Sequence, residues 1–124
     1  MNTVLWGLAS VLAVAFLAAG AMKLSQPKEK LVASGMGWAG DMSAGTVKLI
    51  GAMEVLAAVG LTVPALSGVA PVVVPLAALG LVLVMVGGVV VHARRGETQM
   101  IIVNVALLAF AAVVMWGRFG PYSF

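Results

Sequence analysis

Hydrophobic residues gather in four long blocks that short, more polar connections separate, namely residues 3–22, 46–63, 71–91 and 100–117. Apolar side chains cover every face of these blocks, without the alternation of a β-strand, so each block predicts a helix and not a strand of a barrel. At about 1.5 Å per residue, each is about as long as the hydrocarbon core of a bilayer is thick. The pattern therefore predicts four transmembrane helices.

The connections indicate how these helices are joined. The longest connection, residues 23–45, contains a short helix start at Pro27, and we expect residues 27–34 to lie in the membrane interface, with Leu31 and Val32 facing lipid. Trp38 would anchor the return of the chain into the membrane. Residues 64–70 and 92–97 are tight turns, which favour antiparallel neighbours. The predicted fold is an all-α, antiparallel four-transmembrane-helix bundle with a short interfacial helix between the first two spans, as one domain over residues 1–124.

Composition agrees with a membrane protein and narrows the chemistry. The chain is 63% hydrophobic and 9% charged, against roughly 25% charged residues in soluble domains. It has no cysteine and one histidine, so disulfides, thiol chemistry and a structural zinc site are not expected. We expect no metal site and no cofactor of the chain's own. Any electron transfer would need a redox cofactor that the chain binds, and a quinone is the candidate.

Basic residues predict the orientation in the membrane. They cluster beside the first and third connections, while the opposite side carries only Arg118. By the positive-inside rule both termini lie outside and the two polar connections are cytoplasmic. Because membrane orientation accounts for this charge, the net charge of +3 does not indicate nucleic-acid binding. The cations beside the two cytoplasmic connections are Lys23, Lys28, Lys30, Lys48, Arg94 and Arg95.

Glu54 is the residue least expected in this sequence. It lies in the middle of the second block, about 12 Å below one membrane surface. At that depth an ionisable side chain costs at least ~2.5 kcal/mol unless it faces a partner or a wet cavity. Lys23, at the end of the first block, can extend along its own helix toward this level. We therefore predict that Lys23 and Glu54 form a pair.

Two interpretations of this pair stay open. It is either a buried ion pair that fixes the helix register, or part of a pocket open to the cytoplasmic leaflet, where Glu54 acts as acid, base or ligand anchor with Lys23. Asn104 and His92 come from the other two blocks and converge on the same level. His92 is otherwise a solvated interface residue. With Lys48, these residues form the candidate ligand-binding set.

Short motifs in this chain resemble those of the DoxX-like family of small four-helix bacterial membrane proteins, in its actinobacterial form. The motifs are AGAMKL at residues 19–24, KLIGAMEVLAAVGL at residues 48–61, HARRGE at residues 92–97 and the ending GRFGPY. The resemblance implies a location in the bacterial cytoplasmic (inner) membrane and an association with membrane redox complexes, including those of quinone-linked sulfur oxidation and oxidant defence. The fold is also similar to that of the emopamil-binding and sigma-2 receptor group, which holds sterol-like lipophiles inside the membrane.

The leading hypothesis is an integral membrane accessory protein that binds a lipophilic small molecule, with quinone as the candidate, in an intramembrane pocket and serves redox or stress metabolism. The alternatives are a membrane-embedded isomerase or proton-transfer enzyme that uses Glu54, and a purely structural assembly subunit. Expected partners are the lipid bilayer, the lipophile and proteins of a membrane redox complex. Gly80 and Gly87 share one helix face, which suits either a homodimer or packing within one bundle.

Overall fold

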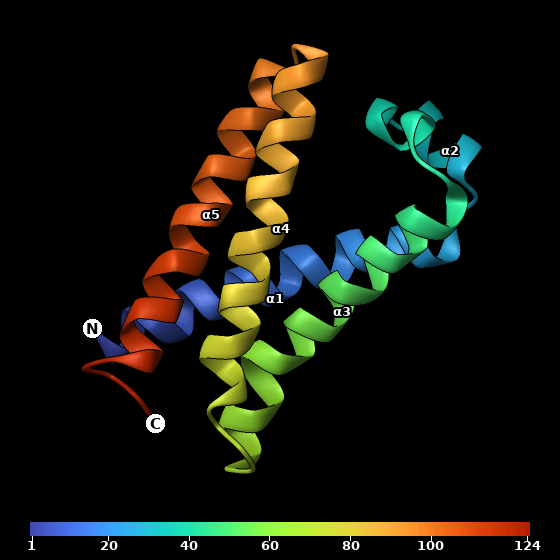
Figure 1. Cartoon of the computed structure of the whole chain (residues 1–124). Coiled ribbons are helices and arrows are strands. Elements are labelled where there is room, and N and C mark those ends of the chain that lie inside the picture. The colour runs from blue at the N-terminus through green and yellow to red at the C-terminus, as the bar shows by residue number, and fades with distance from the viewer.

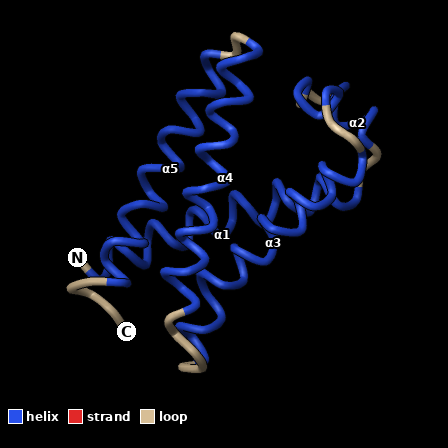
Figure 2. The backbone as a smooth tube through the Cα atoms, in the orientation of Figure 1, coloured by secondary structure: helices blue, strands red, loops and turns tan.

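The computed structural model describes all of residues 1–124 and contains only helices and short connections (Figure 2). Four of the helices are long and apolar enough to cross a membrane, which confirms the predicted four-helix membrane architecture. A short α-helix and a 3₁₀ helix lie between the first two. In chain order the elements are α1 (Asn2–Ser25), α2 (Lys28–Ala33), η1 (Gly37–Asp41), α3 (Ala44–Ser67), α4 (Val73–Arg95) and α5 (Thr98–Phe119).

The long helices form two antiparallel pairs. α1 packs along α3 and α4 packs along α5, and the pairs join through contacts of α3 with α4 and of α1 with α5. Figure 1 shows the pairs meeting near both chain termini and separating toward α2. We call the end with the termini and the α3–α4 turn the closed end. The end with α2, η1 and the α4–α5 turn is the open end.

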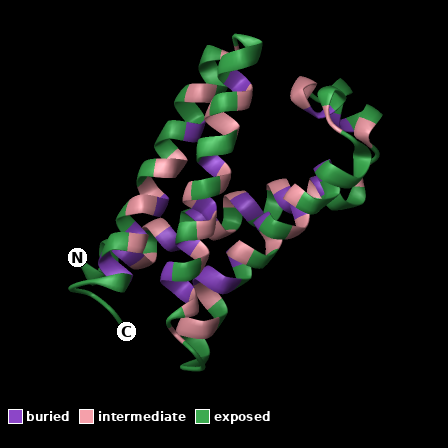
Figure 3. Ribbon diagram, viewed as in Figure 1, coloured by how far each residue is buried: buried purple, intermediate pink, exposed green.

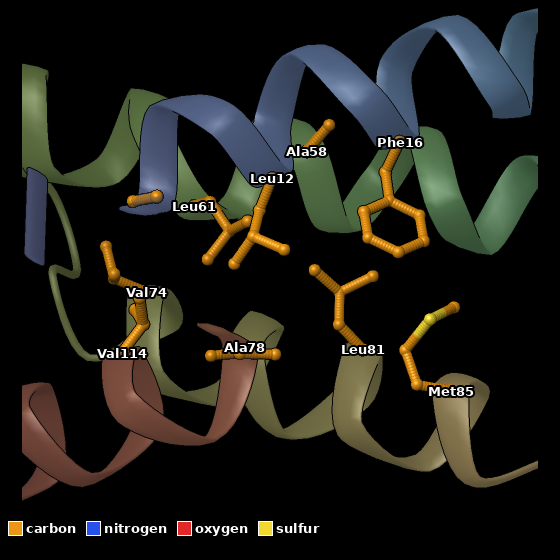
Figure 4. Close-up of a cluster of buried hydrophobic side chains, with 11 residues drawn as sticks. Leu12, Phe16, Ala58, Leu61, Val74, Ala78, Leu81, Met85 and Val114 are labelled. Carbon is orange, nitrogen blue, oxygen red and sulfur yellow. The ribbon is translucent and has the colours of Figure 1, made fainter. Parts of the chain in front are cut away.

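A hydrophobic core holds the two pairs together in the closed half. Leu12 and Phe16 of α1 point toward Leu81 and Met85 of α4, with Leu61 of α3 beside them (Figure 4). Most of these side chains are almost completely buried. Many residues on the outer sides of the long helices are exposed, as the green segments of the ribbon in Figure 3 show. Exposed apolar side chains on all four long helices fit a surface that meets lipid rather than water.

The ends of the long helices differ from the predicted blocks by one to four residues. α4 begins at Val73, two residues later than predicted, and continues to Arg95, so the turn predicted at residues 92–97 begins too early. α3 continues through Pro64 to Ser67, so the turn predicted to begin at Pro64 is also wrong. A proline ends a helix only where the freed backbone groups find no other partner. The helix instead ends where Gly68 adopts the left-handed conformation, with φ of 72°, which favours glycine.

The short helix of the first connection is present, but one of its predicted contacts is wrong. Leu31 was expected to face lipid, and it is instead fully buried against Ala39 of η1 and Val47 of α3. Val32 is partly exposed, as expected. Leu31 therefore folds α2 and η1 back onto the start of α3, instead of leaving the connection spread along the membrane surface.

α1 and α3 approach each other closely at two glycines near the open end. A Cβ atom at Gly51 would lie 2.8 Å from Lys23 Cβ and 2.9 Å from the carbonyl oxygen of Gly20. At Gly20, a Cβ atom would lie 2.6 Å from the carbonyl oxygen of Gly51. Only glycine permits such an approach between membrane helices. This crossing brings Lys23 on α1 next to α3.

Replacing Gly51 with valine should therefore separate α1 from α3 and destabilise the protein by about 1–3 kcal/mol, because the new side chain overlaps backbone as well as side-chain atoms. Gly7→Val is the matched control, since a Cβ atom at Gly7 meets nothing within 4 Å. Thermal unfolding of both variants in the same detergent measures the difference. Equal stabilities would show that the close crossing is not required.

Candidate functional site

A cavity of about 590 Å³ lies between the two helix pairs in the open half. All four long helices and the connection between α1 and α3 contribute to its walls, which are mostly hydrophobic. The cavity exists because the apolar core joins the pairs only in the closed half. Its volume is typical of a site for a small organic molecule.

Lys23 and Glu54 form a buried ion pair in the wall of this cavity. Lys23 Nζ lies 2.7 Å from Glu54 Oε1, and the two side chains are 8% and 4% exposed. At this distance the Lys23 ammonium can donate to Oε1, and no other group of the chain forms a hydrogen bond with the Glu54 carboxylate. The predicted pairing is thus observed, and the carboxylate, which has about four acceptor positions, can still accept a further hydrogen bond.

Asn104 and His92 also reach the cavity, from α5 and α4 respectively. Both side chains are buried. The Asn104 amide lies directly against Gly88, where any larger residue would collide with it. His92 Nδ1 lies 2.9 Å from Glu97 Oε1. These contacts hold both side chains in place. Together with Lys23 and Glu54, they give the cavity four polar residues, one from each long helix.

Lys48 is placed differently from the other candidate residues. It is exposed, and its Nζ donates a hydrogen bond of 2.9 Å to the carbonyl oxygen of Leu24. It is not among the residues that line the cavity. In this structure Lys48 satisfies a carbonyl group at the C-terminal end of α1, where a cation is favourable.

Several cavity residues were not recognised as site residues in the sequence. Trp38 of η1 lines the cavity, and Lys23 Nζ lies 5.6 Å from the centre of its ring, within the range of a cation–π interaction. Five of the eight methionines also line the cavity, which a one-dimensional pattern could not distinguish from lipid-facing positions. They are Met36, Met42, Met53, Met85 and Met100.

Gly80 and Gly87 line the same cavity. A Cβ atom at either position would meet nothing within 4 Å. Within this chain the shared glycine face of α4 is therefore not a packing groove for a neighbouring helix. It forms a smooth part of the cavity wall and leaves room beside α4.

A charged network connects η1 to the end of α4 across the open end. Arg95 pairs with Asp41 of η1 and with Glu97, at 3.2 Å from Nε to Oε1. The hydrogen bond from His92 and the charge of Arg95 hold the pKa of Glu97 below its usual value. Glu97 therefore stays ionised at neutral pH, and its contribution is lost only as pH falls through that lowered pKa. Through Asp41, the network ties the segment that carries Trp38 to α4.

Replacing Arg95 with glutamine should release η1 from α4 and increase amide hydrogen exchange in residues 36–42 a few-fold, because exposed ion pairs are individually weak. Arg94→Gln is the matched control, since Arg94 is exposed and makes no ion pair. Hydrogen–deuterium exchange in lipid nanodiscs measures both variants. The same exchange rates in both would mean that the network does not hold the segment.

Comparison with known proteins places this architecture in a family. A family model described as the DoxX-like family matches residues 7–114. The matched region contains all four polar residues that line the cavity. No curated protein and no solved structure matches the chain. Because the family match covers most of the sequence, the resemblance noted in its motifs is confirmed, and the chain belongs to the DoxX-like family of multi-pass membrane proteins.

Proposed function

We propose that this membrane protein binds a lipophilic small molecule in the cavity beside Lys23 and Glu54. The observation that carries the proposal is a buried ion pair that lines a large, mostly apolar cavity within membrane-spanning helices. An ion pair that served only to hold two helices together would not need an adjacent cavity. Apolar walls with a few convergent polar groups are typical of ligand sites.

The cavity walls suit a ligand with a broad apolar surface. Methionine side chains are flexible and polarisable, so they adapt to irregular shapes and make favourable contacts with aromatic rings. Trp38 offers a flat aromatic surface at the polar end. Lys23 and Asn104 can donate hydrogen bonds there, and Glu54 can accept one.

A quinone is the candidate ligand, and the residues present fit one. Its carbonyl oxygens would accept hydrogen bonds from Lys23 or Asn104, and its ring would lie among methionine side chains beside Trp38. A bound quinone would supply two-electron redox chemistry, while the chain would bind and orient it. The association with membrane redox complexes that the motif resemblance implies motivates a proposed role as an accessory to such a complex in redox or stress metabolism.

Replacing Glu54 with glutamine should abolish co-purification of the ligand while the protein remains folded, because the amide keeps the shape and loses the charge. Glu29→Gln is the control, since Glu29 is exposed on α2 and lies outside the cavity. Native mass spectrometry of gently solubilised protein, followed by solvent extraction, identifies the bound molecule. If all forms carry only bulk phospholipid, the binding proposal fails, and a structural role in an assembly becomes the better explanation.

The proposal also places the open end in the cytoplasm, where the basic residues of α2 and the α4–α5 turn would lie. The absence of native cysteine allows a direct test with single cysteines. In intact cells a membrane-impermeant maleimide should label Ser123→Cys at the closed end, and should label Ser34→Cys at the open end only after lysis. The reverse pattern would invert the orientation.

A further inference from the structure

α3 and α4 are in direct contact near the closed end. We call the line along which these two helices face each other the seam. A Cβ atom at Gly60 of α3 would lie 3.0 Å from Ala77 Cβ and 3.4 Å from Val73 Cγ1 of α4. Such distances leave no room for a ligand between the helices. The contact marks the faces that α3 and α4 present to each other.

Toward the open end the same two faces separate. Gly80 and Gly87 follow Ala77 at helical spacing on α4, and Met53 lies two turns before Gly60 on α3. All three line the cavity, and a Cβ atom at either glycine would meet open space. The seam is therefore closed by direct helix contact at one end and lined by glycines at the other.

This part of the seam is continuous with the outer surface. Met53 and Leu83 line the cavity, yet they are 44% and 64% exposed. Since α3 and α4 span the membrane, the surface beside them faces lipid chains. The cavity thus has a lateral opening toward the bilayer between α3 and α4.

The buried end of the cavity indicates the chemistry of a headgroup. Glu54 is 3% exposed, and Lys23 is its only partner within the chain, so its carboxylate keeps acceptor positions that no group of the chain fills. Lys23 already neutralises its charge, so a charged headgroup would bring an uncompensated charge into an apolar cavity. A neutral hydroxyl group can donate to the Glu54 carboxylate without that cost.

We propose that the ligand is a neutral amphiphile whose hydroxyl headgroup donates to Glu54 and whose hydrocarbon chain leaves the cavity between α3 and α4, past Gly80 and Gly87, into the bilayer. This inference rests on the proposed binding function and defines its ligand class. Long-chain alcohols and the reduced, hydroxyl-bearing forms of chain-bearing quinones share this chemistry. The glycines then serve as a passage for the chain.

The test compares ligands that differ only in the chain. Binding of a benzoquinol with a decyl chain, of the same benzoquinol without a chain, and of dodecanol is measured in nanodiscs by the fluorescence of Trp38. Trp6→Phe and Trp116→Phe are introduced first, so that Trp38 is the sole reporter. Affinity for dodecanol equal to that for the decyl benzoquinol would identify the hydroxyl and chain as sufficient, whereas preference for the quinol would identify its ring as part of recognition.

Gly87→Leu should weaken binding of the decyl benzoquinol at least ~10-fold, equivalent to about 1.4 kcal/mol, and weaken binding of the chainless compound much less, because the new side chain lies on the path of the hydrocarbon chain. Gly7→Leu is the control, because Gly7 lies outside the cavity with open space around it. Glu54→Gln should weaken both compounds. Loss in Glu54→Gln with no chain-dependent loss in Gly87→Leu would overturn the passage and keep the binding function.

A second measurement maps the chain directly. A dodecanol with a diazirine at the end of its chain should form adducts on α3 and α4 near Met53 and Leu83. Adducts confined to Met100 and Val103 of α5, which also line the cavity and are exposed, would place the exit between α1 and α5 and overturn the proposal. No saturable binding of any compound would instead contradict the proposed function itself.

Discussion

The close crossing of α1 and α3 at Gly20 and Gly51 is the contact on which the open half of the protein depends. In that half the apolar core no longer joins the two helix pairs. Two backbones without side chains between them can approach closely enough for Lys23 and Glu54 to meet. At this distance each residue neutralises the charge of the other, so neither is left unpaired inside the membrane. The pairs can then diverge while each remains intact.

This division explains why a cavity persists beside a well-packed core. In the closed half, side chains of Leu12, Leu61 and Leu81 fill the space between the pairs. In the open half, Gly80 and Gly87 occupy the corresponding face of α4, and a Cβ atom at either would meet no other atom within 4 Å. The distance between the pairs at the open end is bridged by ionic contacts from Arg95 to Asp41 instead of hydrophobic packing. Exposed ionic contacts are individually weak, so this bridge is the less stable part of the fold.

The sequence predicted those features that follow from the energetic cost of placing a charged residue in an apolar helix. A carboxylate in an apolar block requires a partner, which identified Glu54 and Lys23 before their distance was known. Features that depend on which face of a helix meets which neighbour were not predictable. Leu31 and the cavity methionines have the same hydrophobic character whether they face lipid, core or ligand. Trp38 was expected at the membrane interface, and only the folding of η1 over the open end places it against Lys23.

The structure also affects how far the basic residues can be used to assign orientation. Three of the six cations near the open end are engaged in specific contacts, since Lys23 pairs with Glu54, Arg95 with Asp41 and Lys48 with the Leu24 carbonyl. A cation retained for such a contact says little about topology. The other three, Lys28, Lys30 and Arg94, make no ion pair and lie at the open end. At the closed end the only basic side chain is Arg118, which is buried and bound to Asn2 and the Tyr122 carbonyl. The asymmetry of unengaged positive charge therefore still favours the open end as the cytoplasmic one.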